Sequence, residues 1–406
     1  MTTQKQDGGT EARISAMPAS ARVIFFMLKR LRIGALSVTL PDGRRFDFGT
    51  AEKGQEAHII VENMKFFRTL LRRGSMGFAV SYMDGWWHTP DLSLLLNILN
   101  QNVDVYSQTI ERNWLTNSMN KLIHRLRPNT RAGSKKNIHA HYDLGNDFYE
   151  LWLDSTMTYS AARFSNSQMS LREAQNEKYR SLAQQAKIGP NDHVLEIGCG
   201  WGGFAEFAAT EIGCQVTGIT ISNEQLEYAR KRIEKAGLSD RVDLKFCDYR
   251  DVTEKYDRIV SIEMFEAVGE NYWSSYFSQV KNCLKPGGHA GLQVITIAND
   301  RYATYRKSVD FIQRYIFPGG MLPSPKILYS KFNEAGLKLD RQIDFSNDYA
   351  RTLAVWRHKF IDVWPEIQKL GFDTRFRNMW EYYLAYCEAG FSSSSIDVSH
   401  FVLSHK

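Results

Sequence analysis

The pattern of apolar residues changes near residue 137, and the part of the chain that follows alternates between two kinds of segment. Short apolar runs predict strands at 193–197, 215–220, 242–247, 258–262 and 290–297. Helical patterns lie between them, at 203–210, 223–236 and 272–283. Strands that alternate with helices are typical of a parallel sheet with helices on both faces. We therefore predict a Rossmann-like α/β domain over residues 133–406.

The first 132 residues predict a smaller α+β domain. Residues 13–33 combine basic and apolar residues in a helix-like pattern, with Pro18 near its start. Further strands and helices are expected at 36–40, 45–48, 61–71 and 91–99. The turn sequence Pro41-Asp42-Gly43 joins the two strands. A basic linker at 125–136 then leads into the α/β domain.

Charge is distributed unevenly along the chain. Residues 1–130 hold 17 Lys and Arg against 11 Asp and Glu, which accounts for the whole net charge of +6. This basic region suggests an anionic surface as partner, and the helix at 13–33 could lie on a membrane interface. A solvated basic face and packing against the domain behind it are the alternatives. We expect no nucleic-acid partner, and a homodimer stays open.

Cysteine use and hydropathy indicate the compartment. No apolar run approaches the roughly 20 residues that a spanning helix needs, and no cleavage site follows the apolar residues 23–28. The five cysteines form no C-x-x-C pair, so a disulfide framework is not expected. A cytoplasmic protein, peripherally associated with the inner face of the membrane, fits these observations best.

The segment at 194–203 carries the strongest chemical signal. A buried strand runs into the glycine-rich turn Gly198-Cys-Gly-Trp-Gly202, and a helix follows, as in nucleotide-binding sites. Glu196 inside the strand end would suit the ammonium of a methionine moiety and would disfavour a pyrophosphate. Asp248 and Tyr249, after the third strand, would suit an adenine by hydrogen bonding and stacking. Together these residues predict a site for S-adenosylmethionine (SAM).

The second strand departs from the usual nucleotide-binding pattern, because it ends at Thr220 and not at an acidic residue. Thr220 or Gln225 would then bind the ribose diol. We expect the cofactor-binding residues to be Tyr159, Ser160, Glu196, Gly198, Gly200, Gly202, Thr220, Ile221, Gln225, Asp248, Tyr249 and Ile262.

A polar and aromatic segment precedes the sheet, at 137–149 and 157–161. His139, His141 and Asp143 could suggest a metal site, but no third well-spaced ligand accompanies them, so we expect no metal. A lid over the cofactor is the favoured interpretation.

These residues resemble the cyclopropane-fatty-acyl-phospholipid synthases and the related mycolic acid cyclopropane synthases, over roughly residues 135–400. The matching stretches are His141-Tyr-Asp-Leu-Gly-Asn-Asp-Phe-Tyr149, Tyr159-Ser160, Glu196-Ile-Gly-Cys-Gly-Trp-Gly-Gly203, Gly218-Ile-Thr-Ile-Ser222, Asp248-Tyr-Arg-Asp251, Phe265-Glu266, Lys285-Pro-Gly287, Tyr315-Ile-Phe-Pro318 and Asp348-Tyr349. The resemblance implies a class I methyltransferase fold. It also implies transfer of the SAM methyl to a double bond of a lipid acyl chain, with a bicarbonate ion as the base that completes a cyclopropane.

In that family the bicarbonate is held by residues that match Glu266, Tyr349 and the backbone of Ile295. Two positions depart, because Ala161 stands where the family has Cys and Gln293 stands where it has His. An amide supports an anion less well than an imidazole can, so ring closure is in doubt. The product stays open between a cyclopropane and a methyl or methylene branch.

Two other functions stay open. Some relatives methylate amines, which would need a short site with an acidic or aromatic cage. A non-catalytic, cofactor-binding membrane protein is the third interpretation.

Overall fold

The computed structural model describes residues 17–50, 55–103 and 144–406. The chain forms two compact units, one of residues 1–122 with 371–393 and one of residues 123–370 with 394–406. The expected linker at 125–136 and the residues His139, His141 and Asp143 lie outside the described residues.

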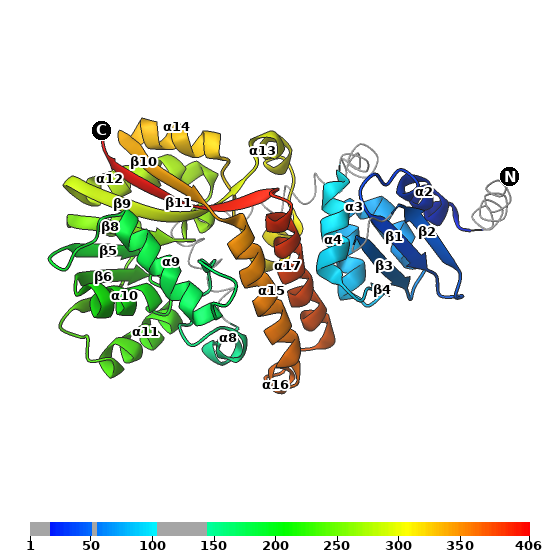
Figure 1. Ribbon diagram of the computed structural model, residues 1–406, viewed down its shortest axis with the longest axis horizontal. Helices are drawn as coiled ribbons and strands as arrows, with labels where there is room; N and C mark the ends of the chain where they lie inside the picture. The colour runs from blue at the N-terminus through cyan, green and yellow to red at the C-terminus, as the bar shows by residue number, and fades with distance from the viewer. Residues whose placement is uncertain (1–16, 51–54, 104–143) are drawn as a thin grey trace. The chain divides into compact units, whose positions relative to one another are not determined.

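The larger unit is built on a seven-stranded sheet in the order β10-β11-β9-β8-β5-β6-β7 (Figure 1). The strands are β5 (His193–Ile197), β6 (Gln215–Thr220), β7 (Val242–Phe246), β8 (Tyr256–Ile262), β9 (Leu284–Ile297), β10 (Leu337–Asp344) and β11 (Ile396–His405). Strands β5 to β9 pair in parallel, whereas β11 runs antiparallel between β9 and β10. From β5 the chain builds the sheet outward on one side through β6 and β7, and then on the other side through β8 and β9. Open α/β sheets bind their ligands at such a reversal of strand order.

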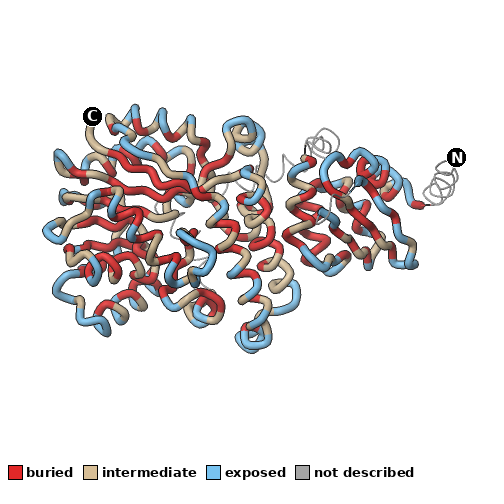
Figure 2. The backbone as a smooth tube through the Cα atoms, viewed as in Figure 1, coloured by how far each residue is buried: buried red, intermediate tan, exposed pale blue. Residues whose placement is uncertain are grey.

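Helices cover both faces of this sheet, as the alternating pattern predicts. One face carries α9 (Leu171–Gln185), α10 (Gly203–Phe207) and α11 (Asn223–Lys235), whose apolar side chains form a core with Val194, Val216 and Val260. The other face carries α12 (Trp273–Cys283) and α14 (Pro325–Ala335), packed on Leu195, Ile259 and Leu292. Successive strand residues thus serve opposite cores, and Figure 2 shows the strands as the most buried part of the unit.

Further helices complete the larger unit. They are α8 (Asn146–Trp152), α13 (Asn299–Tyr305), α15 (Ser346–Asp362) and α16 (Trp364–Lys369), with π turns at Ala208–Ile212 and Ile312–Ile316 and 3-10 turns at Tyr249–Asp251, Phe265–Ala267 and Glu270–Tyr272. Helix α15 contacts β11 and α8. It therefore brings Tyr349 to the strand ends of the sheet.

The smaller unit has a four-stranded sheet in the order β2-β1-β3-β4. Its elements are α2 (Ala19–Leu28), β1 (Ala35–Thr39), β2 (Arg45–Gly49), β3 (Glu56–Val61), α3 (Lys65–Met83), β4 (Trp87–His88), α4 (Leu92–Gln101) and α17 (Thr374–Ser392). Phe25 of α2 packs against Phe46 and Phe48 of β2 and Phe67 of α3. An α+β unit was predicted here, and its described part is one.

The predicted boundary needs a correction, because residues 371–393 belong to the smaller unit and not to the domain expected at 133–406. Helix α17 packs on α3 and α4. Asn378 Nδ2 donates to the carbonyl oxygens of Tyr82 and Met83, at 3.3 Å each, and Arg375 pairs with Asp84. The chain thus returns to its first unit before β11 completes the sheet of the second.

Most predicted elements agree with the structure, and the five predicted strands of the α/β domain all form. The helix expected at 61–71 is wrong at its start, since residues up to Val61 extend as β3 and the helix begins at Lys65. The helix expected at 203–210 ends as an α-helix at Phe207 and continues as a π turn. Strands β10 and β11 were not predicted.

Candidate active site

The glycine-rich turn leads from β5 into α10 with three glycines at positive φ. The φ angles of Gly198, Gly200 and Gly202 are 85°, 51° and 81°, a region that side chains with a Cβ rarely adopt. A Cβ on Gly198 would also come within 2.8 Å of Met264 Cγ. The glycine-rich turn therefore forms at the carboxyl end of β5, where the sequence predicted it.

Glu196 is a buried acid beside this turn. It is 3% exposed, and its Oε2 has no hydrogen-bond partner among the described residues. Burial raises the pKa of Glu196 to about 8, against the opposing charges of Lys178 and Arg232. A buried, unpartnered carboxyl at this place fits the ammonium of SAM.

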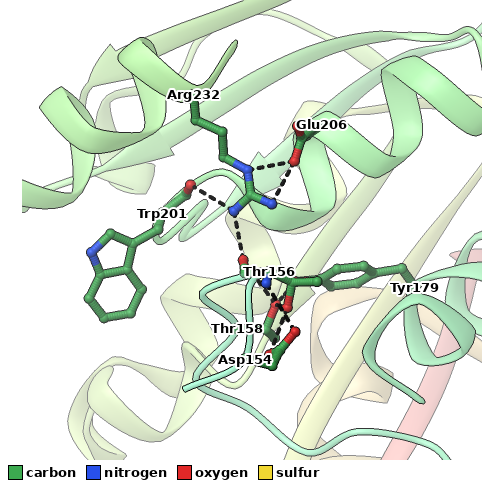
Figure 3. Close-up of polar contacts among 7 residues, drawn as sticks. All are labelled: Asp154, Thr156, Thr158, Tyr179, Trp201, Glu206 and Arg232. Carbon is green, nitrogen blue, oxygen red and sulfur yellow. Dashed lines mark hydrogen bonds and ion pairs between the residues drawn. The ribbon is translucent and has the colours of Figure 1, made fainter. Parts of the chain in front are cut away.

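Arg232 on α11 ties the glycine-rich turn to the segment that leads to Tyr159 (Figure 3). Its guanidinium pairs with Glu206 at 2.5 Å and donates to the carbonyl oxygen of Thr156 at 2.6 Å. Thr156 Oγ1 in turn bonds Asp154 at 2.9 Å and Thr158 at 2.7 Å. Residues 154–158 are thus held against the glycine-rich turn by Arg232 of α11, which is itself fixed by Glu206 of α10.

The predicted ribose residues contact each other. Thr220, at the end of β6, donates from Oγ1 to Gln225 Oε1 at 3.2 Å, and both side chains are buried. Ile221 follows directly and is partly exposed. The arrangement leaves the amide nitrogen of Gln225 as the donor toward a ligand.

The predicted adenine acid, Asp248, is held by a neighbour. Both of its oxygens accept from the Arg250 guanidinium, at 2.8 and 2.6 Å. Tyr249 packs its ring edge to face with Tyr276, with centroids 5.3 Å apart. Asp248 would therefore contact an adenine through its remaining lone pairs, while Arg250 fixes its orientation.

The pair Tyr159-Ser160 is anchored from both sides. Lys178 Nζ donates to Ser160 Oγ at 2.7 Å, and Gln175 Nε2 donates to the Ser160 carbonyl at 2.9 Å. Burial lowers the pKa of Lys178 to about 7, although Glu263, Asp154 and Glu196 oppose that shift. The Tyr159 ring lies 5.3 Å from Trp356 and 5.6 Å from Trp152. The rings of Tyr159, Trp152 and Trp356 form an aromatic wall. The Tyr159-Ser160 pair therefore connects this aromatic wall to the buried amine of Lys178.

Glu263, which the sequence analysis did not identify, is at the centre of the site. It follows the last residue of β8, Ile262, and its carboxylate accepts three hydrogen bonds. The Ala161 N–H donates to Oε1 at 2.8 Å, Gln293 Nε2 donates to Oε1 at 2.6 Å, and the Tyr349 hydroxyl donates to Oε2 at 2.7 Å. Ala161, Gln293 and Tyr349 were expected to bind an external anion. In the structure all three donate to the side-chain carboxylate of Glu263.

The other two expected anion ligands contact each other. Glu266 Oε1 accepts from the backbone N–H of Ile295 at 2.6 Å, and Glu266 Oε2 has no hydrogen-bond partner among the described residues. Burial first, and then the charge of Glu263, raises the pKa of Glu266 to about 8. The site thus holds two carboxyl groups in different environments.

Gln293 is oriented by a chain of side chains behind it. Since its Nε2 donates to Glu263, its Oε1 accepts from His400 Nε2 at 2.9 Å. His400 Nδ1 then accepts from Gln185 Nε2 at 3.1 Å. Burial lowers the pKa of His400, which agrees with a neutral ring in this tautomer.

The residues do not fit a bicarbonate ion. The donors of Ala161, Gln293 and Tyr349 are all directed at Glu263, and that of Ile295 is directed at Glu266. A further anion would meet two carboxyl groups and no free donor of this set. The place that the resemblance assigns to a bicarbonate is occupied here by the side-chain carboxylate of Glu263. Among the described residues, no group of His, Cys, Asp or Glu is placed to hold a metal ion.

Comparisons with known proteins agree with this geometry. Residues 129–401 match the family model described as mycolic acid cyclopropane synthetase. The chain is 38% identical to tuberculostearic acid methyltransferase UfaA1 of Mycobacterium tuberculosis, over 83% of this chain and 80% of that one. It is 36% identical to cyclopropane-fatty-acyl-phospholipid synthase of Escherichia coli, over 86% of this chain and 88% of that one.

A solved structure shares the architecture. The crystal structure of mycolic acid cyclopropane synthase CmaA1 complexed with SAH and CTAB superposes with a TM-score of 0.64 at 29% identity, covering 67% of this chain and 98% of that one. That relative binds the demethylated form of SAM. The sheet is thus a class I methyltransferase sheet, and SAM is the cofactor of this chain. This chain belongs to the mycolic acid cyclopropane synthetase family and is a SAM-dependent C-methyltransferase.

Proposed function

We propose that this protein transfers the methyl carbon of SAM to the double bond of unsaturated acyl chains in phospholipids. The product is a cyclopropane or a methyl- or methylene-branched chain. The observation that carries the proposal is the carboxyl pair of Glu263 and Glu266 at the strand ends beside the glycine-rich turn, next to an aromatic wall. Two relatives that match most of this chain support the lipid substrate by their names, since one is named for a fatty acid and the other for a fatty-acyl phospholipid.

The site suits a reaction that passes through a cation. An alkene that attacks the sulfonium methyl leaves a carbocation, which must be kept from water until it loses a proton. Aromatic faces attract cations. Tyr159, Trp152 and Trp356 supply such faces, and the ring of Tyr349 packs edge to face with Trp356 at 6.2 Å. The aromatic wall would therefore shield the cation, and the carboxylate would balance its charge.

We also propose that the enzyme works at the cytoplasmic face of a membrane, where its basic N-terminal segment, residues 1–130, contacts anionic phospholipid. No helix in the described parts of the chain is long and apolar enough to cross a bilayer. On α2 the side chains of Arg22, Val23 and Phe26 are exposed, and Arg30 is exposed just after the end of the helix. A surface that combines apolar and basic residues suits peripheral contact with lipid.

The test is incubation of the protein with SAM and vesicles of unsaturated phospholipid, followed by mass spectrometry of the acyl chains. We expect the acyl chain to gain about 14 mass units for a ring or methylene product, which adds CH2. A saturated methyl branch adds CH4 and would give a gain of about 16. No mass gain on any unsaturated phospholipid would refute the proposal.

An amine substrate is the alternative that the aromatic wall also suits, because a substrate ammonium could occupy the same place as the carbocation. Methylation of a small amine, with no change in any lipid, would favour that activity. Binding of SAM without turnover on either substrate would favour a non-catalytic role.

A further inference from the structure

The carboxylate of Glu263 is held as a ligand would be held. Its three donors come from parts of the chain far apart in sequence, namely the backbone of Ala161, the amide of Gln293 on β9 and the hydroxyl of Tyr349 on α15. Gln293 is itself fixed by His400 of β11. Charged groups that accept several preorganised donors are oriented more firmly than any single bond could orient them. The site is therefore built around this one carboxylate.

The backbone of Glu263 supports the same conclusion. Its φ angle is 50°, in the left-handed region that residues with a Cβ seldom adopt. Such a conformation is unfavourable for a residue with a Cβ, and glycine adopts it without that cost. Its N–H donates to the Gln293 carbonyl at 2.9 Å, so the residue is locked in place. Strain of this kind is typical of residues whose position matters for function.

The two carboxyl groups of the site are not equivalent. Burial raises the pKa of Glu263, but its three hydrogen bonds and the charge of Lys178 oppose that shift and favour the ionised form. Glu266 accepts one hydrogen bond to its side chain and is disfavoured as an anion, first by burial and then by the charge of Glu263. In such a pair, one group stays ionised and can accept a proton while the other stays neutral. Glu263 is the group arranged to accept the proton.

We infer that the Glu263 carboxylate is the general base of this enzyme and that no bicarbonate takes part. The inference rests on the proposed function. In the first step the π electron pair of the alkene bonds to the SAM methyl carbon, and the carbon–sulfur pair remains on sulfur, giving S-adenosylhomocysteine and a carbocation. In the second step a proton leaves the transferred methyl for Glu263 Oε2, which keeps a lone pair beside its bond to Tyr349. The released C–H pair closes the ring or, after a hydride shift, forms an exocyclic methylene.

This step narrows the product. A proton lost from the transferred methyl leaves a ring or a methylene group. A saturated methyl branch would need a hydride donor, which neither the site nor the reaction supplies. The immediate product of this enzyme is therefore a ring or a methylene.

The first experiment needs no variant. Turnover of the wild type on unsaturated phospholipid vesicles is measured in carbonate-free buffer, with and without added sodium bicarbonate, and with SAM that carries a trideuterated methyl. We expect the same rate in both buffers and two deuterium atoms in the product. A rate that falls without bicarbonate and returns with it would overturn the inference while leaving the proposed function intact, and so would three retained deuterium atoms. A wild type that alters no lipid would instead refute the proposed function.

The second experiment replaces the base. Glu263→Gln removes the proton acceptor and should lower kcat about 10²- to 10⁴-fold, whereas Glu254→Gln, at an exposed acid outside the site, should leave it unchanged. Glu263→Gly removes the acceptor, relieves the positive φ and opens the space, so bicarbonate should restore turnover. Binding of ¹³C-bicarbonate, followed by NMR line broadening, should appear in Glu263→Gly and be absent in the wild type. Wild-type turnover by Glu263→Gln, or bicarbonate binding to the wild type, would contradict the inference.

Discussion

Glu196 is the residue through which cofactor binding should report a proton. Its pKa is raised to about 8 by burial, so below that pH the free protein holds the carboxyl protonated. The ammonium of the cofactor favours the ionised form, so binding must release a proton. We expect the affinity for S-adenosylhomocysteine to rise with pH up to about 8, by at most tenfold per pH unit.

Calorimetry in buffers of different ionisation enthalpy measures that proton directly. In Glu196→Gln the affinity should be lower and independent of pH over the same range. A wild type that binds without proton exchange below pH 8 would show that Glu196 is not the group that meets the ammonium.

Tyr349 tunes the carboxylate that we assign as the base. Its hydroxyl bond to Glu263 lowers the pKa of that carboxyl, against the raising effect of burial. A hydrogen bond to a charged group contributes about 1.5–3 kcal/mol, which corresponds to roughly 1–2 pKa units. Because the base must be ionised, Tyr349→Phe should shift the acid limb of the plot of kcat against pH to higher pH by that amount.

The matched control is Tyr329→Phe on α14, outside the site, which removes an exposed hydroxyl that donates to Gln342 Oε1 of β10 at 2.8 Å. Its profile should coincide with that of the wild type. An unmoved acid limb in Tyr349→Phe would mean that Glu263 is not the titrating group.

At the scale of elements, Arg232 connects α11 to the turn that delivers Tyr159 and Ser160. Arg232→Met removes the bonds to Glu206 and to the Thr156 carbonyl, so the turn should loosen where it covers the cofactor. We expect KM for SAM to rise more than kcat falls, because the chemistry groups are untouched. The free energy of unfolding should drop by about 1–3 kcal/mol.

Arg230→Met supplies the comparison on the same helix. Arg230 donates to the Leu244 carbonyl of β7 at 2.7 Å and has no bond to the 154–158 turn. It should lower stability without raising KM for SAM. Equal effects of the two variants on KM would indicate that α11 acts as a whole and that the Arg232 bonds are not specific.

The strands that bind the cofactor were predictable because their signals are local. A buried run followed by three glycines needs only a short stretch of sequence, and β5 and β6 were predicted at their observed bounds. Strands β10 and β11 were missed. They belong to the sheet through pairing with β9, and much of β10 is exposed, which weakens its apolar pattern. Pairing over such separations leaves little trace in a single segment.

Glu263 was missed for the same reason. In sequence it is one acid after a strand, and the expected anion ligands were found without the anion itself. Its role depends on Ala161, Gln293 and Tyr349, which lie 102, 30 and 86 residues away. A local signal did exist, because an acid between the strand at 258–262 and Phe265-Glu266 places two carboxyl groups three residues apart.

At the scale of the whole molecule, the chain combines a basic N-terminal segment, residues 1–130, with a catalytic unit whose proposed substrate lies in a bilayer. Helix α2 buries Ile24, Phe25 and Leu28 in its own unit and leaves Phe26 57% exposed, with the Arg30 guanidinium 4.6 Å from that ring. An aromatic ring beside basic side chains on an amphipathic helix suits the interface between head groups and acyl chains. This surface should bring the enzyme to its substrate.

The final prediction tests that surface by co-sedimentation with vesicles. Phe26→Ser removes the exposed ring, and Arg30→Gln removes a charge that contributes about 1 kcal/mol near an anionic surface, or about fivefold in affinity. Both should weaken binding to anionic vesicles, and the charge variant should matter less in 1 M salt, where the screening length is about 3 Å. Leu370→Ser, at an equally apolar residue 45% exposed in the other unit, is the control and should bind as the wild type does. Since turnover on lipid dispersed in detergent needs no bilayer, all three variants should keep it. Loss of vesicle binding in Leu370→Ser, or its retention in Phe26→Ser, would place the membrane contact elsewhere on the molecule.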